Sequence, residues 1–297
     1  MRRKTYLFVL FMLGLIIALS GGLAQAQDGH QHFLWEVGSS QAKVYLLGSL
    51  HFFTPQMYPL DSAIETAYQG SAGVAVEVDL NKMNQGKIQQ FIMEKATYAN
   101  GDSLKSHLSQ ATYSAIQKRL NANGMDITSF NRFRPWFIAT FLTTMELQKA
   151  GVDPSYGIDR YFTDQAAKDK KGIDELETWD LQLNLLNSLG DLLQEEYLAS
   201  AINDLDNTAD SVAKMESAWR TGDTATMERL VYSTQEPAMQ PIYEKMFYER
   251  NRNMAAKIDG YIKSGKTIFV VVGSGHLIGP KGILSLLRQA GYSTRQL

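Results

Sequence analysis

The sequence predicts an α/β fold, in which a mixed sheet is built from strands near both ends of the chain and a large helical lobe is inserted between them. Short β-branched runs bounded by glycine, typical of buried strands, occur near both ends. Between about residues 82 and 262 the apolar residues mostly recur at helical spacing instead. The terminal segments must meet to form one continuous sheet, so we expect one domain over residues 27–297.

Composition excludes several classes of protein. The chain has 297 residues, of which 44% are hydrophobic and 20% charged, so it can form a sizeable packed core. Its net charge of −2 gives no basic surface for nucleic acid. It has no cysteine, which excludes thiolate metal sites, a cysteine nucleophile and disulfides.

The first 26 residues have the pattern of a secretory signal peptide. Residues 2–4 are basic, residues 7–19 form an apolar core, and Ala24-Gln25-Ala26 matches a small-residue cleavage site. The apolar run is shorter than the ~20 residues that a transmembrane helix needs. We therefore expect cleavage after Ala26 and export to the periplasm or the medium, with no stable membrane span afterwards. An uncleaved N-terminal anchor is the alternative.

The expected elements follow in order. Two strands, over 33–37 and 43–47, are joined by a short turn containing Gly and Ser. Next come a helix over about 61–70 and a strand over 74–79. The inserted lobe is predicted as helices over about 82–132, 136–149, 157–168 and 179–262, with a short strand over 171–176. The chain closes with a strand over 267–272, a helix over 278–290 and a final short strand over 292–297.

Two of the five histidines stand in the same setting, just after a predicted strand. One strand runs into Gly48-Ser49-Leu50-His51 and another, 225 positions later, into Gly273-Ser274-Gly275-His276. We expect both histidines on loops. In open α/β sheets, ligands bind in the crevice at the carboxyl ends of the strands. If the strands are neighbours, His51 and His276 face one site.

Glu77 is the third candidate residue. It shares a strand face with Ala75 and Asp79, and a carboxylate in such an apolar run is costly to bury unless it is paired. Asp79, at the strand end, is expected to be solvated. Two imidazoles and a carboxylate suit a divalent ion such as zinc, manganese or cobalt, with Glu77 as a ligand or as the general base. From spacing alone, a metal site and two hydrogen-bonded loop histidines are equal alternatives.

Other motifs indicate no second site. His107 is expected at the surface of a polar helical stretch, and His30 and His32 in a solvated tail. The glycines after Val272 resemble a dinucleotide-binding loop, but no acidic residue follows about 20 positions on. Ser274 lacks the preceding glycine of a Gly-x-Ser-x-Gly elbow, so a serine hydrolase is not predicted.

With these residues in place, the chain resembles the TraB/GumN family, which includes the Tiki proteases. The resemblance rests on the two Gly-x-x-His motifs and on Glu77 in its strand. It also rests on further short blocks in the same order, namely 134–136, 157–159, 176–178 with Gln182, and 249–251.

The resemblance implies a fold related to the erythromycin esterases and the haem-binding ChaN proteins. For Tiki members it implies metal-dependent peptidase activity that needs both motif histidines and the glutamate. Carried over, these are His51, His276 and Glu77. Arg250 would hold a substrate carboxylate or stabilise an oxyanion, or else form an ion pair with Glu177 or Asp159. Arg134 is expected to be structural.

We therefore expect an exported hydrolase that depends on a divalent metal ion, manganese, cobalt or zinc, and cleaves peptide bonds or small esters or amides. The esterase relatives keep a metal-free hydrolase open, with a histidine as the base. The main alternative is a periplasmic protein of ChaN-like type that binds haem or a small ligand without turnover. A catalytically idle member that acts through its helical lobe is a third hypothesis. The sequence predicts no oligomeric state.

Overall fold

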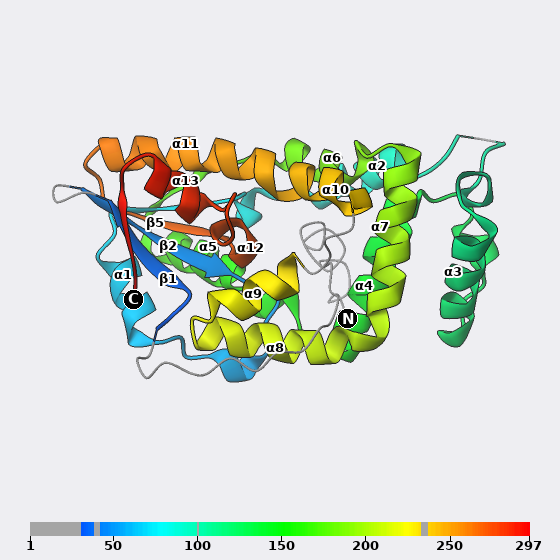
Figure 1. Cartoon of the computed structure of the whole chain (residues 1–297), viewed down its shortest axis with the longest axis horizontal. Coiled ribbons are helices and arrows are strands. Elements are labelled where there is room, and N and C mark those ends of the chain that lie inside the picture. The colour runs from blue at the N-terminus through cyan, green and yellow to red at the C-terminus, as the bar shows by residue number, and fades with distance from the viewer. Residues whose placement is uncertain (1–30, 39–41, 100, 233–236) are drawn as a thin grey trace.

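The computed structural model describes residues 31–38, 42–99, 101–232 and 237–297. Figure 1 shows the strands gathered at one end of the molecule and a lobe of helices at the other. The predicted signal peptide, residues 1–26, lies outside the described ranges, as does His30. Within those ranges, no helix combines the length and the apolar character that crossing a membrane requires.

One six-stranded mixed sheet organises the domain, with strand order β4-β3-β5-β2-β1-β6. The strands are β1 (Leu34–Gly38), β2 (Lys43–Ser49), β3 (Gly73–Val76), β4 (Gly172–Glu175), β5 (Ile268–Gly273) and β6 (Ser293–Gln296). β2, β5, β3 and β4 run parallel, while β1 is antiparallel to β2 and β6. The predicted α/β fold, with strands from both ends of the chain in one sheet, is confirmed.

β5 lies in the middle of this sheet, between β2 and β3. Gly273 pairs with Ser49 of β2, and Val271 pairs with Val76 of β3. Every residue of β5 and β3 is buried, as expected for parallel strands covered on both faces. Because the three strands are parallel, their carboxyl ends finish at the same edge of the sheet.

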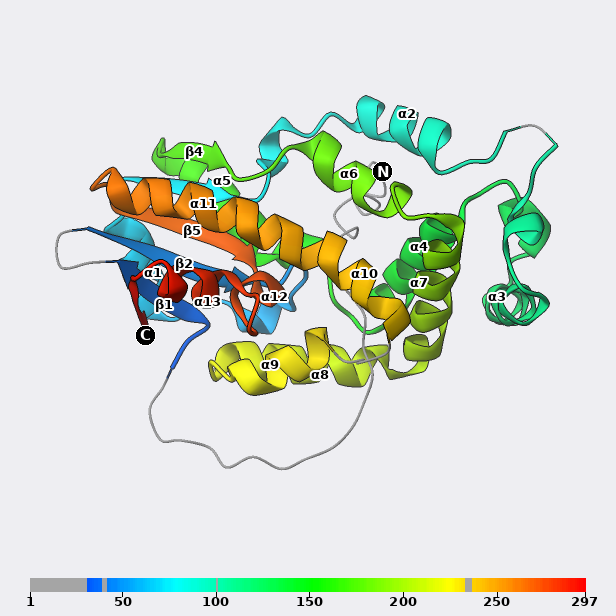
Figure 2. The same ribbon diagram turned by 45° about the horizontal axis from the view of Figure 1, so that its top comes forward.

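Helices cover both faces of the sheet. α1 (Ser62–Gln69) and α5 (Ile158–Asp169) pack on one face, and α11 (Glu249–Lys263) and α13 (Ile283–Gln289) lie on the other (Figure 2). Parallel crossovers are right-handed. Since the chain moves outward from β2 to β3 to β4 and then returns to β5, the helices before and after the return lie on opposite faces.

The remaining helices, apart from the short helix over 274–277 described below, form the lobe. Most of them share an apolar core around Trp136, Leu198 and Tyr243, whereas the two helices over 208–231 pack into the core of the sheet. The lobe helices are α2 (Gln85–Lys95), α3 (Gln110–Ala122), α4 (Pro135–Lys149), α6 (Trp179–Asn187), α7 (Asp191–Asp204), α8 (Thr208–Arg220), α9 (Thr224–Val231) and α10 (Gln240–Tyr243). Short 3₁₀ turns connect elements: η1 (Pro55–Met57), η2 (Leu80–Lys82), η3 (Leu104–His107), η4 (Ile127–Phe130), η5 (Pro154–Tyr156), η6 (Leu205–Asn207) and η7 (Pro237–Met239). A π-helical turn, η8 (Glu244–Tyr248), joins α10 to α11.

Four sequence expectations are corrected. The helix expected over 82–132 is interrupted between α2 and α3, because the backbone N–H groups of Tyr98 and Leu104 bond to carbonyls of residues 132 and 131. β3 ends at Val76, so Glu77 follows the strand. Asp79 is buried, not solvated, since its side chain accepts the backbone N–H of Asn81 at the start of η2.

The fourth correction concerns His276. It lies on a one-turn helix, α12 (Ser274–Leu277), and not on a loop. This turn follows β5 directly. The imidazole is therefore held by helical backbone at the end of a fully buried strand.

The helical lobe is fastened to the sheet edge by Trp219 of α8. Its indole Nε1 donates a hydrogen bond to the carbonyl oxygen of Gly48 at 2.6 Å, next to the first histidine motif. The indole is buried and its ring also contacts Phe53, with ring centroids 5.0 Å apart. One side chain thus links the lobe to β2.

We predict that Trp219→Phe lowers the free energy of unfolding by about 1–3 kcal/mol more than Trp136→Phe does, because it leaves the Gly48 carbonyl without its indole donor. Trp136 is a matched control: it is equally buried, and its Nε1 has no hydrogen-bond partner within the described ranges. Urea unfolding of both variants measures the difference. Equal losses would contradict the fastening role.

Candidate active site

Glu77 lies at the carboxyl edge of the sheet and is held by three donors. Its Oε1 accepts the backbone N–H of Gly273 at 2.7 Å. Its Oε2 accepts Arg250 Nη2 at 2.7 Å and Gln182 Nε2 at 3.0 Å. The residue is 4% exposed. A buried carboxylate needs such partners, and here they come from β5, α11 and α6.

His51 is oriented by a carboxylate on α5. Its Nδ1 donates to Asp159 Oδ2 at 2.8 Å, and the other oxygen of Asp159 accepts Ser49 Oγ at 2.7 Å. Burial opposes the charged imidazole, but the charge of Asp159 and its hydrogen bond outweigh burial and raise the pKa of His51 to about 9. Burial acts against Asp159 too, yet His51 holds the pKa of that carboxyl below its usual value.

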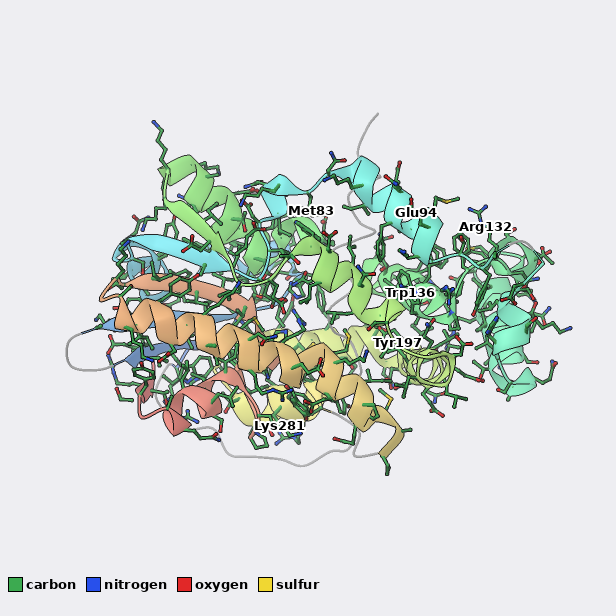
Figure 3. The ribbon with its side chains drawn as sticks, turned by 90° about the horizontal axis from the view of Figure 1, so that it is seen from above. Met83, Glu94, Arg132, Trp136, Tyr197 and Lys281 are labelled. Atoms are coloured by element: carbon green, nitrogen blue, oxygen red, sulfur yellow. The ribbon has the colours of Figure 1, made fainter. Side chains whose placement is uncertain are left out.

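His276 is oriented differently. Its Nδ1 lies 2.6 Å from Asn251 Oδ1, and Asn251 Nδ2 donates to the carbonyl oxygen of Lys281 at 2.9 Å. Figure 3 shows Lys281 beside the sheet end of the molecule, near α11. Burial, and then the nearby positive charge of Arg250, lower the pKa of His276 well below its usual value. This imidazole is therefore neutral at pH 7, with its proton on Nδ1 and a free lone pair on Nε2.

Three of the predicted groups meet at Gly273. A Cβ built on this glycine would lie 3.3 Å from Glu77 Oε1, 3.5 Å from His276 Cδ2 and 3.6 Å from His51 Nε2. His276 Nε2 and Glu77 Oε1 are 3.8 Å apart. The missing side chain of Gly273 thus leaves a small space that two imidazoles and a carboxylate share. The structure brings together the trio that the sequence singled out.

The guanidinium of Arg250 is engaged by protein acceptors and is not available to bind a group in this space. Its Nε and Nη2 bind both carboxylate oxygens of Glu177, its Nη1 donates to the carbonyl of Met246, and its Nη2 also reaches Glu77. Of the two ion-pair partners offered by the sequence, the structure selects Glu177. Asp159, the other, pairs with His51 instead. Arg250 thus holds Glu77 in place, and Gln182 bridges the two glutamates.

The donor types at Gly273 fit a divalent ion, since borderline metals take imidazole nitrogen and carboxylate oxygen. In a tetrahedral site, two donors lie about 3.3 Å apart, close to the 3.8 Å between His276 Nε2 and Glu77 Oε1. As they stand, however, no three His, Asp or Glu side chains in the described ranges form a metal-holding group. Glu77 is already engaged by protein donors.

His107 stays at the surface, as expected, whereas His32 differs from the expected solvated tail. His107 is 22% exposed, pairs with Asp102 and Asp191, and stacks on Tyr98 with ring centroids 4.3 Å apart. His32 has a side chain that is 16% exposed and lies 3.3 Å from Asp61. Each histidine pairs with a carboxylate that is distant in sequence: His107 with Asp191, and His32 with Asp61.

Sequence reasoning missed the residues that orient the imidazoles. It considered Asp159 only as a partner for Arg250, and it gave Asn251 and Gln182 no role. The available signal was their place in the short blocks 157–159, 176–182 and 249–251, each of which supplies one partner of the trio.

A comparison with known proteins identifies the family of this chain. A sequence model of the TraB/PrgY/gumN family matches residues 33–296. The chain belongs to this family. The match covers every strand of the sheet and all three residues at Gly273, so the family resemblance drawn from the motifs is confirmed.

Two relatives of this TraB/PrgY/gumN protein are informative. Metalloprotease TIKI2 of Xenopus tropicalis is 23% identical over 91% of this chain, which spans only 61% of that protein's length. Uncharacterized protein YbaP of Escherichia coli K12 is also 23% identical, over 82% of this chain and 87% of its own length. No solved structure matches significantly.

The pair of His51 and Asp159 predicts how stability depends on pH. The pKa of His51 is about 9 when folded and about 6.5 when unfolded, so the folded state keeps a proton that the unfolded state releases. The stabilisation is complete below the unfolded pKa and is lost as pH rises to about 9. His276, whose pKa is lowered, is neutral in both states over most of this range.

We expect the stability advantage of wild type over His51→Gln to shrink by about 1–2 kcal/mol between pH 6 and 9.5, a value discounted because the side chain is 20% exposed. Urea unfolding in the presence of a chelator measures it. Asp159→Asn should show the same flattened profile. A constant difference across this range would contradict the charged pair.

Proposed function

We propose that this protein is an exported hydrolase that cleaves peptide bonds or small esters or amides at the Gly273 site. His51, Glu77 and His276 would hold a divalent ion, of which zinc, manganese and cobalt fit the donor set. Export rests on the sequence of residues 1–26.

One observation carries the proposal. Each imidazole has its Nδ1 engaged by a fixed acceptor, Asp159 for His51 and Asn251 for His276. This leaves both Nε2 atoms on the side of the shared space, and neither makes a hydrogen bond within the described part of the chain. Metal-binding histidines are commonly oriented in this way, with the second nitrogen donating to a carboxylate or a carbonyl.

The family comparison supports the same chemistry. TIKI2 carries the name of a metalloprotease, and its similarity extends over nearly all of this chain. At 23% identity the similarity does not transfer the substrate. The similarity does favour hydrolysis over the other reactions that two imidazoles and a carboxylate can catalyse.

Each residue of the Gly273 site has a defined role in the proposed reaction. When bound, the ion would polarise the scissile carbonyl and activate the attacking water. Glu77, held by Arg250 and Gln182, stands 3.8 Å from His276 Nε2 and is placed to accept a proton at its Oε1 if it is not itself a ligand. Arg250 fixes this carboxylate and does not contact the substrate.

Two alternatives use the same residues. In a metal-free hydrolase, the pair of Asp159 and His51 would act as an oriented general base, but a pKa of about 9 leaves His51 protonated at pH 7. A metal ion that binds at Nε2 would instead displace this proton. In a ChaN-like haem-binding protein, the apolar walls beside His276 would contact the porphyrin without turnover. A Soret shift on haem titration, with no hydrolysis, would favour that second function.

We predict that the purified protein binds one divalent ion and that His51→Ala and His276→Ala each lose more than about 100-fold in metal affinity. Asp159→Asn, which removes only the orienting partner, should lose about 10- to 100-fold. Elemental analysis and competition with a chromophoric chelator measure the affinity. A peptidase and esterase screen with added zinc, manganese or cobalt then measures activity.

His107→Ala is the matched control, because His107 also pairs with carboxylates but lies in the helical lobe. It should keep full metal content and activity. If His51→Ala and His276→Ala do so as well, the proposed site is wrong.

A further inference from the structure

A pocket opens beside the two imidazoles and extends away from the sheet. His51, Gly273 and His276 form one wall, while Met215, Met246 and Phe247 belong to another. Tyr197 of α7, labelled in Figure 3, is also part of the lining. The pocket therefore reaches from the candidate active site into the helical lobe.

The lobe side of this pocket is apolar and uncharged. Met215, Met246 and Phe247 are each less than 8% exposed, and their side chains belong to the two cores. The described lining contains no Lys, Arg, Asp or Glu. Its hydroxyl groups are engaged within the protein: those of Ser49 and Ser274 donate to Asp159 and to the carbonyl of Ser49, and that of Tyr197 bonds to Thr140. A group that enters the pocket beyond the imidazoles meets apolar surface.

The π-helical turn η8 contributes two residues of the apolar wall, Met246 and Phe247. Here the N–H of Glu249 bonds to the carbonyl of Glu244, five residues back, which adds a residue to the helical turn. Phe247 lies with its ring centroid 5.2 Å from that of His276. π-Helical turns occur frequently at functional sites.

Gly275 allows this close approach. A Cβ on Gly275 would lie 2.9 Å from the Phe247 ring and 2.8 Å from Cγ1 of Val231. The second histidine motif is thus packed directly against the apolar wall. A substrate bond held at the imidazoles therefore lies close enough to this wall for a neighbouring side chain of the substrate to contact it.

We propose that this pocket binds a bulky, uncharged, apolar side chain of a peptide substrate, next to the bond that is cleaved. The inference rests on the hydrolase function proposed above and specifies its substrate class. Burial of an apolar side chain is favoured by about 10- to 100-fold, whereas a charged group on the lobe side of the pocket, beyond the protonated His51, would lose its hydration without finding a partner there. The two methionines can adapt to aliphatic or aromatic shapes.

Binding of short peptides tests the pocket independently of turnover. N-acetyl-Gly-X-Gly-amide peptides, with X as Phe, Leu, Glu or Lys, are titrated into the full protein and followed by ligand-observed NMR. We expect the Phe and Leu peptides to bind at least 10-fold more tightly than the Glu and Lys peptides. Equal affinities, or no binding of any peptide, overturn the inference.

Val231→Lys adds a positive charge to the partly buried wall and should raise the affinity for the Glu peptide at least 10-fold relative to wild type. Ala225→Lys adds the same charge on the same helix, α9, at an exposed position that is not part of the lining, and should change nothing. Equal effects of the two variants overturn the inference.

Met215→Ala is the second test, in case Val231→Lys does not fold. It should weaken binding of the Phe and Leu peptides about 10-fold. Met227→Ala, at a buried methionine outside the lining, is its control and should leave binding unchanged. An unchanged affinity in Met215→Ala overturns the inference.

Cleavage of the same peptides separates this inference from the hydrolase function. Cleavage that His276→Ala abolishes, with Phe and Leu preferred, supports both. Selective binding without cleavage overturns the hydrolase but keeps the apolar pocket as a ligand site. Cleavage that depends on His276 but shows no preference for the side chain overturns the pocket and keeps the hydrolase.

Discussion

The site depends on the parallel pairing of β5 with β2 on one edge and with β3 on the other. Backbone hydrogen bonds fix Gly273 beside Ser49, and the N–H of Gly273 then reaches the carboxylate of Glu77. Three segments distant in sequence are therefore aligned by strand register and not by flexible loops. A one-residue slip of β5 would turn every side chain of the strand to the other face and separate the trio.

Buried charge is the second constraint. Glu77, Glu177 and Arg250 are each at most 6% exposed, and such charges are tolerated only when their hydrogen bonds are satisfied. Gln182 bridges the two glutamates and Arg250 contacts both. The network joins the end of β3 to α6 and α11. The sheet and the lobe consequently meet through polar contacts at the site and through apolar cores elsewhere.

The sequence predicted the part of the site that depends on strand patterns. The glycine-bounded runs located β2 and β5, and the alternation of valines located Glu77. It did not predict which partner each charged residue selects, because that depends on packing between segments about 100 residues apart, as for His51 and Asp159. For the same reason it did not predict that His107 pairs with Asp191, 84 residues later. The interruption between α2 and α3 arises from backbone pairing that helical periodicity does not record.

The π-helical turn η8 has a consequence for how the protein can change in evolution. Residues on a helix rotate by about 100° for each position, so removing the extra residue would swing Met246 and Phe247 away from Arg250 and Asn251. Two residues of the pocket wall, Met246 and Phe247, lie on one continuous helix with Arg250 and Asn251, which hold Glu77 and His276. New substrate specificities are therefore accessible by exchanging the side chains at 246 and 247. Insertions or deletions in this helix would instead move the pocket wall relative to the residues that hold Glu77 and His276.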